Sequence, residues 1–544
     1  MTEQTSATSR RQGILLATFL ATFLPVLFIE LGVMKITNAV FMYPLDDVFI
    51  HMEIASHLAS EATWGINSNA FGSASSSPLY TLLLAGCFLL FSTNTLVPFI
   101  INCLAAAALL VVLHKALISL HVSAKAHLCC MLAIVFFTPL PILVVSGMEH
   151  TLQCLFVFLF LQRFSTWVIG QESPRARGKA RLPVAIFIYA ALATFIRYEG
   201  LFLIAAACLL LLWHKKIMLS FQLGLFAAAP LIVFGLISLS KGSYPLPNSL
   251  LVKSDSIVFS LSGLVHFAST VLIDKLTIAK GGITSLATQR LLLILPLALF
   301  FCLKVIPKRT VHSYSLLLLI LCTLLHLAFA TTGWFYRYEA YLMLCSVYTV
   351  SMLAWHHGRE IIHTSSKPAL MVGSVLLFFL FFPLFLRSSA AFSKAKQACV
   401  NIYEQQYQMG QFLRRFYDKN PVAANDIGAV AYYSNGYVLD LWGLANIDIA
   451  RSRKRGYWTP TFLESMVTKN NAKIAIVYDS WFDTTLLKQW TKVATWQIRN
   501  NVICGDDVVS FYATDSLVQP SLKRNLILYQ PLLPAGVIVE YPPF

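Results

Sequence analysis

Charged side chains are scarce in this sequence. Asp, Glu, Lys and Arg make up 12% of its 544 residues, about half their usual share in a soluble domain. Hydrophobic residues account for 57% of the chain, and apolar runs long enough to cross a bilayer recur along most of its length. This balance excludes a soluble globular protein and a disordered chain, and it predicts a polytopic membrane protein.

Several signature motifs are also missing. No Gly-rich phosphate loop precedes a helix, no Cys/His spacing fits a zinc site, and no basic tract is interleaved with aromatic residues. The net charge of +16 therefore does not indicate a nucleic-acid partner. Of the eleven cysteines, only Cys399 and Cys504 lie in polar sequence. If this region is extracytoplasmic, oxidation is permitted and these two cysteines are expected to form a disulfide; two buried thiols are the alternative.

Lys and Arg orient the apolar segments, because cytoplasmic loops collect these residues. The run Ile14–Val33 follows Arg10 and Arg11 and indicates an uncleaved first span with a cytoplasmic basic end. The strongest basic loop, Arg175–Arg181, must also be cytoplasmic. These loops predict about eleven crossings, with the N-terminus inside and the C-terminus outside. The other ten spans lie near 97–114, 127–146, 150–169, 183–197, 200–213, 219–239, 289–303, 313–331, 340–355 and 369–386.

Two further apolar stretches do not fit as crossings. They are Leu79–Phe91 and Ile257–Ile273. Counting either one as a span would place the downstream basic loops outside, against the charge rule. We therefore expect both to form helices that lie in or against the outer membrane interface, packed on the bundle.

The composition changes after Arg387. The pattern predicts a transmembrane domain at 1–387, with its first outer loop at about 35–96, and an extracytoplasmic (periplasmic) α/β domain at 388–544. Ser434-Asn435-Gly436 predicts a hairpin between its first two strands. Expected helices lie at Ala391–Phe416 and Pro460–Thr468, and expected strands at Val422–Tyr433, Tyr437–Trp442, Lys473–Tyr478 and Val508–Ala513. The predicted fold class is an all-α polytopic membrane bundle with a C-terminal α/β domain.

Polar residues collect at the outer ends of these spans. They are Asp46, Asp47, His51, Glu149, Arg197, Glu199, Asn248, Lys253, Arg337 and Glu339. Ionisable residues at such positions are costly and are functional candidates. Adjacent carboxylates raise each other's pKa, which makes one of the two aspartates a candidate general base. The same stretch predicts a helix start that places Asp47 and His51 one turn apart on one face.

Each of these candidates also has a purely structural interpretation. Asp46 and Asp47 can cap a helix. Arg197 can close a short hairpin with an ion pair, and Arg337 can snorkel within an aromatic belt. Lys253 can bind an ordinary lipid headgroup as well as a substrate phosphate.

Five segments, in order along the chain, resemble the GT-C membrane glycosyltransferases. They are most similar to the arabinofuranosyltransferase-like branch, which uses polyprenyl-phosphate sugars. The segments are Asp46–His51 with Ser76–Leu84, Ser146–Glu149, Arg197–Gly200, Pro247–Ser249 with Lys253, and Asn425–Ala429 with Asp440–Leu444. The resemblance spans most of the chain.

This resemblance implies a multi-pass transferase of the bacterial inner (cytoplasmic) membrane. It would take a pentose such as arabinofuranose, or a hexose, from a polyprenyl-phosphate donor at the outer leaflet. The acceptor would be an envelope glycan, lipid or protein, and the anomeric carbon would be inverted. The implied partners are thus the lipid-linked donor, the acceptor and membrane lipids.

The resemblance also assigns roles to residues. Asp46 or Asp47 would act as the base, with Glu149 as a second acid. No cofactor is certain, but some relatives use a divalent metal beside the loop acids, and these three residues could hold one. Substrate binding would fall to the remaining candidates, with Arg197 and Lys253 on the donor phosphate and Arg337 replacing a cation that many relatives carry at the position of Glu53. The full set of binding candidates is His51, Arg197, Glu199, Asn248, Lys253 and Arg337.

A transporter or flippase of an anionic lipid or solute is the competing hypothesis, because it would also gather charges within its spans. Transporters generally bind substrate near the midplane and have repeated halves. Here the charges cluster at one face and no internal repeat is present. A surface assembly or binding protein is a third hypothesis.

The topology can be tested with reporter fusions. A reporter fused after Arg387 should be active only outside the cytoplasm, and one fused near Arg177 only inside, because basic loops stay cytoplasmic. The opposite pattern would overturn both the topology and the transferase hypothesis.

Overall fold

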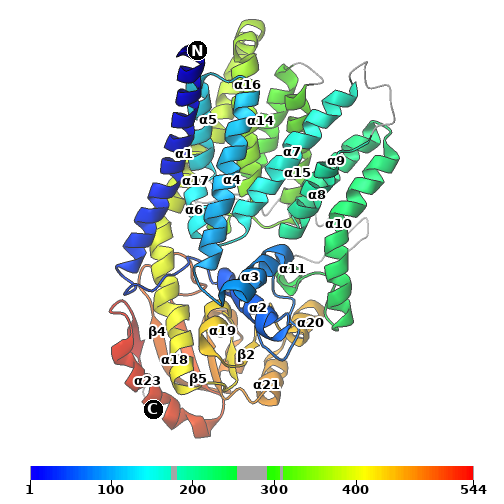
Figure 1. The fold of residues 1–544 in the computed structure, drawn as a ribbon. Helices are drawn as coiled ribbons and strands as arrows, with labels where there is room; N and C mark the ends of the chain where they lie inside the picture. Colours follow the sequence, from blue (N-terminus) through cyan, green and yellow to red (C-terminus); the bar gives the residue numbers. More distant parts are fainter. Residues whose placement is uncertain (1, 173–180, 254–290, 307–309, 543–544) are drawn as a thin grey trace.

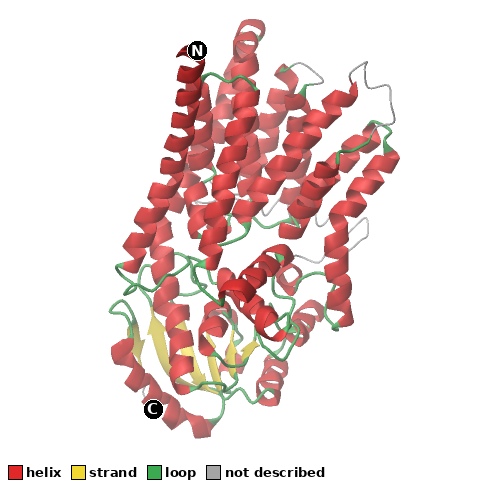
Figure 2. Ribbon diagram, viewed as in Figure 1, coloured by secondary structure: helices red, strands yellow, loops and turns green. Residues whose placement is uncertain are grey.

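The computed structural model describes residues 2–172, 181–253, 291–306 and 310–542. Long helices form a bundle, and a domain with one mixed sheet lies at one end of it (Figure 1; Figure 2). The N-terminus lies at the opposite end of the bundle from this domain (Figure 1). The mostly helical fold expected from the sequence is present, with a small sheet near the C-terminus; the division into two domains stays a prediction.

The bundle helices coincide with the predicted crossings. They are α1 (Thr2–Met34), α4 (Val97–Ser119), α5 (Ala124–Phe137), α6 (Leu140–Val145), α7 (His150–Glu172), α8 (Val184–Ile196), α9 (Gly200–Trp213), α10 (Ile217–Ser240), α14 (Leu291–Val305), α15 (Val311–Phe329), α16 (Ala340–Thr364) and α17 (Lys367–Ile402). The expected span at 127–146 is divided between α5 and α6 at Pro139, since proline lacks a backbone donor. Among the described residues, 6 helices are by themselves long and apolar enough to cross a membrane. The chain is thus a multi-pass membrane protein, and the count of eleven crossings stays a prediction.

Three shorter helices lie between the bundle and the sheet domain: α2 (Asp47–Glu61), α3 (Pro78–Phe91) and α11 (Asn248–Lys253) (Figure 1). Helix α3 matches the stretch Leu79–Phe91 that was expected to pack on the bundle instead of crossing. It lies against α2, and Tyr80 and Leu84 on it are fully buried. The second such stretch, Ile257–Ile273, lies outside the described residues.

The C-terminal domain contains a six-stranded sheet of order β2-β1-β3-β5-β4-β6. Strands β2, β1 and β3 run parallel, and the β3–β5, β5–β4 and β4–β6 pairs are antiparallel. The strands are β1 (Val422–Ala424), β2 (Val438–Asp440), β3 (Ile474–Val477), β4 (Thr491–Gln497), β5 (Val508–Ala513) and β6 (Ile538–Glu540). The helices around them include α18 (Gln408–Phe416), α19 (Gly428–Ser434), α20 (Ile447–Arg455), α21 (Pro460–Lys469) and α23 (Gln519–Tyr529).

The predicted hairpin in this domain is wrong. The expected strand Val422–Tyr433 divides into β1 and helix α19, and β1 pairs with β2 in parallel. Asn435 has a left-handed φ of 60° and ends α19 instead of turning a hairpin. A parallel pair needs a crossover between its strands, and α19 supplies it.

Other expected elements of the domain are present. The helix Ala391–Phe416 forms from the end of α17, one π-helical turn at Tyr403–Tyr407 and α18. The domain boundary drawn after Arg387 therefore falls inside a continuous helix, because a drop in hydropathy need not interrupt helical hydrogen bonding. Helix α21 and strands β3 and β5 lie where they were expected, whereas α20, β4, β6 and α23 were not predicted.

The expected disulfide is also wrong. Cys399 and Cys504 are both free thiols. Cys399 is buried in α17, and the Cys504 thiol instead donates a hydrogen bond to Gln406 Oε1 at 3.4 Å. Of the alternative of two buried thiols, Cys399 fits, whereas Cys504 is only partly buried.

A buried ion pair holds the α15–α16 connection against α17. Arg387 donates to the Glu339 carboxylate and to the carbonyl oxygen of Tyr336. Glu339 also accepts the backbone N–H of Gly333 at 3.0 Å, and neither charged side chain is exposed. These contacts enclose the short segment that carries Arg337.

This pair yields a stability prediction. Replacing Arg387 with Met should destabilise the fold by about 3–5 kcal/mol, because Glu339 would remain buried without its cation. The double variant with Glu339→Gln should recover part of that loss. Thermal unfolding of the purified protein in detergent would measure both effects, and simple additivity of the two single losses would contradict the pairing.

Candidate active site

The two adjacent aspartates have different partners. Helix α2 begins at Asp47, as predicted, but the Asp46 side chain does not cap it. The Asp46 carboxylate instead accepts the backbone N–H groups of Gly428 at 2.6 Å and Ala429 at 2.7 Å, at the start of α19. Burial, and then the neighbouring Asp426 carboxyl, raise the pKa of Asp46 well above its usual range. Asp46 therefore links the α2 region to the C-terminal domain.

Asp47 lies against a different element. Its carboxylate accepts a hydrogen bond from Nη2 of Arg337, in the α15–α16 connection. The Asp47 side chain is 27% exposed, whereas that of Arg337 is 2% exposed. Nε and Nη1 of Arg337 are buried and have no hydrogen-bond partner in the described structure. This guanidinium can therefore still bind an anion.

Arg197 is in contrast nearly saturated with partners. It forms a bidentate pair with Glu199 through Nε and Nη2, at 2.9 and 2.5 Å. Its Nη1 donates to Glu149 at 2.6 Å and lies 3.5 Å from Ser76 Oγ. Although burial opposes it, Arg197 holds the pKa of Glu199 below its usual value. The ion-pair interpretation of Arg197 and Glu199 is confirmed, with Glu149 added to it.

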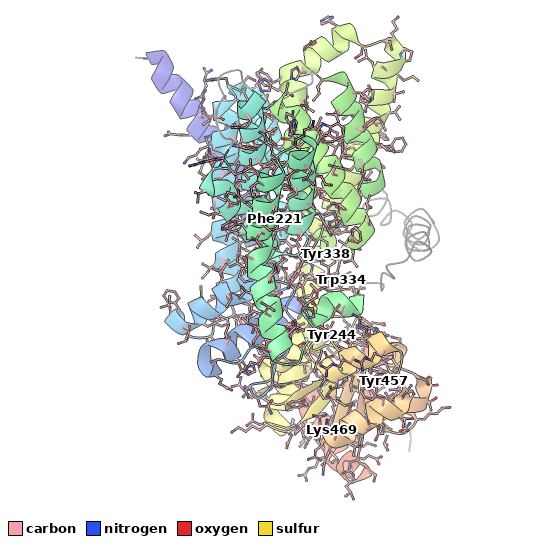
Figure 3. All side chains as sticks on the ribbon, turned by 90° about the vertical axis from the view of Figure 1, so that its right-hand side faces the viewer. Phe221, Tyr244, Trp334, Tyr338, Tyr457 and Lys469 are labelled. Atoms are coloured by element: carbon pink, nitrogen blue, oxygen red, sulfur yellow. The ribbon has the colours of Figure 1, made fainter. Side chains whose placement is uncertain are left out.

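Both arginines lie over the ring of Tyr338, at 5.4 Å for Arg197 and 5.0 Å for Arg337. Figure 3 shows Tyr338 and Trp334 at the end of the bundle that faces the C-terminal domain. The ring is buried, so it contributes a cation–π surface away from water. Arg197 and Arg337 therefore share one aromatic partner.

His51 lies one turn after Asp47, as the sequence predicted. Its Nδ1 is 3.0 Å from Ser75 Oγ and 3.1 Å from Thr81 Oγ1, and its Nε2 is 3.7 Å from a Glu149 oxygen. Burial lowers the pKa of His51 in spite of the nearby carboxylates. The imidazole is therefore neutral at neutral pH and serves as a hydrogen-bonding group.

A serine-rich loop arranges these side chains. The carbonyl oxygen of Ser73 accepts the N–H of Asn248 at 2.8 Å, and the hydroxyl of Ser77 donates to Ile196 O at 2.5 Å. With the contacts of Ser75 and Ser76 given above, residues 73–77 touch the start of α11, helix α2 and the α8–α9 turn. One short loop thus sets the spacing between three separate elements.

Unpartnered polar atoms concentrate at this end of the bundle. The side-chain amide of Asn248 is fully buried and forms no hydrogen bond within the described residues. The hydroxyls of Ser73 and Ser249, one oxygen of Glu149 and both ring nitrogens of His150 are in the same condition. Buried polar groups without partners are rare and call for an explanation, and a polar ligand provides one. The Lys253 side chain lies outside the part of the chain that the structure describes.

The three acids named as metal ligands do not gather. Asp46 binds the backbone of α19, Asp47 binds Arg337, and Glu149 binds Arg197. Across the described ranges, no group of three His, Cys, Asp or Glu side chains is arranged to hold a metal ion. The donor set expected from the sequence therefore does not fit a shared divalent cation.

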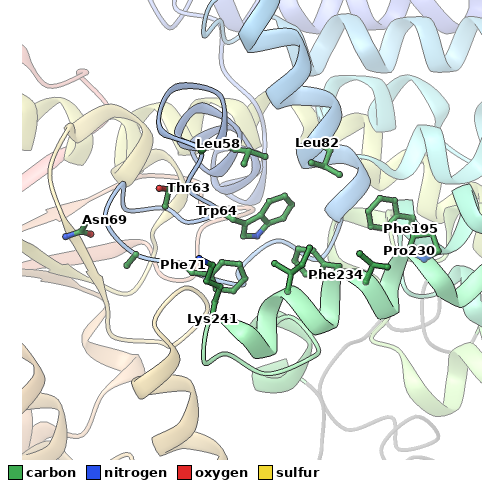
Figure 4. A pocket seen from close by; sticks show the side chains of 14 residues that line it. Leu58, Thr63, Trp64, Asn69, Phe71, Leu82, Phe195, Pro230, Phe234 and Lys241 are labelled. Atoms are coloured by element: carbon green, nitrogen blue, oxygen red, sulfur yellow. The ribbon is translucent and has the colours of Figure 1, made fainter.

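An apolar cavity of about 540 Å³ lies beside these charges, between the end of α2, helix α3 and helix α10. Figure 4 shows Trp64, Phe71 and Phe234 in its wall, with Lys241 among the lining residues. Phe195, two residues before Arg197, also lines it. The cavity is suited to a hydrocarbon chain, not to a sugar.

Some residues of the site were not foreseen. A lone arginine within an apolar helix was the available signal for Arg387. His150 directly follows Glu149 and could have been considered with it. Nothing in the sequence distinguished Ser75 from the serines around it.

The fold is similar to that of a protein of solved structure. The structure of ArnT from Cupriavidus metallidurans in the apo state matches with a TM-score of 0.50 and 11% identity, covering 92% of this chain and 98% of that chain. The structure of the same protein bound to undecaprenyl phosphate matches with a TM-score of 0.48 and 12% identity over the same shares. The likeness to the apo structure shows a shared fold. That this chain is a GT-C glycosyltransferase, of the arabinofuranosyltransferase-like branch, stays a prediction.

Comparison of the amino-acid sequence with known families and proteins covers a smaller part of the chain. A family described as a domain of unknown function (DUF8728) matches residues 400–512, which lie mostly in the C-terminal domain. No curated protein matches the sequence.

The Arg197 network can be tested for its contribution to stability. Arg197→Gln should destabilise the protein by about 3–5 kcal/mol, because it leaves Glu149 and Glu199 buried without their shared cation. Lys473→Gln removes a cation from an exposed pair with Asp515 and should cost less than about 1 kcal/mol. Equal losses in thermal unfolding would contradict a supporting role for Arg197.

Proposed function

We propose that this protein is a membrane glycosyltransferase that transfers a sugar from a polyprenyl-phosphate donor to an acceptor hydroxyl on the extracytoplasmic side of the membrane. One observation carries the proposal. A partly exposed carboxylate, Asp47, lies against a buried guanidinium, Arg337, and two donors of Arg337 have no hydrogen-bond partner among the described residues. A base and a phosphate-binding cation are the two groups that this reaction requires.

The reaction would proceed as a displacement at the anomeric carbon. The acceptor hydroxyl gives its proton to Asp47, and its oxygen forms the new glycosidic bond from the face opposite the phosphate. The bond between the anomeric carbon and the phosphate oxygen breaks, and polyprenyl phosphate leaves with the electron pair. The product is inverted. Because the leaving group is already an anion, a cation and not a general acid has to stabilise it.

Arg337 suits the phosphate better than Arg197 does. Arg197 is paired with Glu149 and Glu199, whereas Nε and Nη1 of Arg337 have no partner in the described part of the chain and can form charge-assisted bonds with an anion. A phosphate that binds Arg337 would also compete with Asp47 for this cation and release the carboxylate for the acceptor. Donor binding and activation of the base would then be coupled.

The other candidate residues take supporting roles in this proposal. Buried polar contacts join four of them and fix their positions in the site: Glu149, Arg197, Glu199 and His51. Asn248 offers its unpartnered amide to the donor, and Lys253 remains a candidate second cation. The proposed sugar is a pentose such as arabinofuranose, or a hexose, and the proposed acceptor is an envelope glycan, lipid or protein. Membership of the arabinofuranosyltransferase-like branch is part of the same proposal.

The apolar cavity supports a lipid-linked donor. Its wall of aromatic and aliphatic side chains can take isoprenyl units, and Lys241 supplies a positive charge at it. ArnT, whose apo structure has this fold, has also been crystallised with undecaprenyl phosphate. The gathering of charges at one end of the bundle, and not at its middle, favours transfer over transport.

The proposal predicts different defects for Asp47 and Arg337. In nanodiscs, release of undecaprenyl phosphate would be measured from donors that carry arabinofuranose or a hexose. Asp47→Asn should lower turnover by about 100-fold or more while undecaprenyl phosphate still binds. Arg337→Gln should weaken that binding by about 10-fold or more, because a charge-assisted contact is lost.

Lys473→Gln, which changes an exposed cation far from the site in the chain, serves as the control and should leave both measurements unchanged. Near-normal turnover by folded Asp47→Asn protein would refute the base assignment. It would also return weight to the transporter hypothesis.

A further inference from the structure

The contact between Asp46 and α19 has no part in the reaction proposed above, yet its hydrogen bonds are short and its backbones lie close together. Both carboxylate oxygens of Asp46 are occupied, one by the N–H of Gly428 and one by the N–H of Ala429. The carbonyl oxygen of Asp46 accepts the N–H of Phe49 at 3.0 Å, and this hydrogen bond lies at the start of α2. The same residue therefore begins α2 and binds the C-terminal domain.

Gly428 shows how close the two backbones are. A Cβ atom at this position would lie 2.1 Å from the carbonyl oxygen of Asp46 and 2.6 Å from its Oδ2. No side chain can be accommodated at such distances without moving α19 away from α2. Glycine is thus required here for close approach, and its backbone conformation is not the reason.

Two further contacts join the same surfaces. The ring of Phe49 packs 5.8 Å from that of Tyr432 and 5.6 Å from that of Tyr433. The side chain of Asn67, in the loop after α2, pairs with both backbone groups of Val438 on β2, at 3.1 and 2.9 Å. The expected first outer loop, at about 35–96, which includes α2 and Asp47, therefore contacts the C-terminal domain near its beginning and near its middle.

We infer that Asp46 is a positioning residue and that the C-terminal domain is an integral part of the active site. The contact of Asp46 with Gly428 and Ala429, which we call the Asp46 clasp, fixes the first turn of α2 and so the place of Asp47 relative to Arg337. This inference rests on the proposed role of Asp47 as the base. It gives a function to the segment Asn425–Ala429, which the reaction scheme leaves without one.

The geometry argues against Asp46 as the base itself. A carboxylate whose two oxygens already accept backbone N–H groups is poorly placed to take a proton from an incoming hydroxyl. Asp426, the nearest other acid, is held by Gln406 and Tyr478, at 2.6 and 3.0 Å, and keeps this junction polar and ordered. Asp47 is 27% exposed and lies against Arg337, at the end of the bundle where the other candidate residues gather.

Three variants test the clasp without any substrate. Hydrogen exchange of the Gly428 and Ala429 amides would be measured in nanodiscs. Asp46→Ala removes both acceptors and should speed exchange of these amides by about 10-fold or more. Asp46→Asn keeps one acceptor oxygen and should give a smaller increase. Gly428→Ala should speed exchange at Ala429 and at the first turn of α2, because the added Cβ separates the helices.

Turnover then reports positioning. With the donor panel used above, Asp46→Ala and Gly428→Ala should lower kcat by about 10- to 100-fold, since a misplaced base loses rate steeply. The KM for the donor should change less than 3-fold, because Arg337 is untouched. Asp46→Asn should retain more activity than Asp46→Ala, whereas a base at this position would make both equally inactive.

Leu463→Ala is the matched control. Leu463 lies on α21, is buried, and packs in a core cluster of the C-terminal domain that includes no described residue of α2 or α19. The variant should leave a cavity and lower the thermal stability of the domain, while kcat per folded molecule stays within about 3-fold of the parent. An equal loss of kcat in Leu463→Ala would overturn the inference, because general damage to the domain would then explain the result.

The exchange measurement separates this inference from the proposed function. Fast exchange at Gly428 and Ala429 in the unaltered protein would overturn the clasp even if sugar transfer is found. Unchanged kcat in Asp46→Ala, or equal inactivity of Asp46→Asn and Asp46→Ala with exchange unaltered, would overturn it as well. Protected amides in a protein that turns over no donor would overturn the proposed function and leave the clasp standing.

Discussion

A charge buried at the end of an apolar bundle needs a counter-charge, and this constraint organises the whole site. Removing a charged group from water costs several kcal/mol unless a partner compensates it. Arg387 meets this requirement with Glu339, and Arg197 with two acids. Arg337 meets it only in part, through the partly exposed Asp47. In the proposed reaction, this incomplete pairing lets Arg337 bind the anionic phosphate of the donor.

The two neighbouring aspartates have the same side chain but different partners. Both begin the same helix, but one reaches the backbone of the C-terminal domain and the other reaches the bundle. The first therefore joins two parts of the protein, and the second lies against Arg337. If Asp47 is the base, as proposed, the C-terminal domain helps to place it; this domain matches a family of unknown function over much of its length.

The sequence predicted the bundle well because its signals are strong and local. Long apolar runs mark the helices, and α3 was distinguished from the crossings by charge balance alone. The small domain was harder to predict. Segment Val422–Tyr433 contains strand-forming Val, Ile and Tyr residues, yet its second half forms α19, since the parallel pairing of β1 and β2 requires a crossover. Helix α20 and strand β4 carry weaker patterns and were missed.

The candidate residues were also largely visible in the sequence, because charges at the ends of apolar spans are conspicuous. Composition and spacing therefore determined the class of protein and the end of the bundle where polar groups meet. Only the tertiary structure decided that Arg197 is saturated while Arg337 keeps two donors without a described partner, which aspartate contacts the C-terminal domain, and that Cys399 and Cys504 do not pair. The reason is physical: a partner's identity depends on distances between segments hundreds of residues apart, and local sequence does not encode those distances.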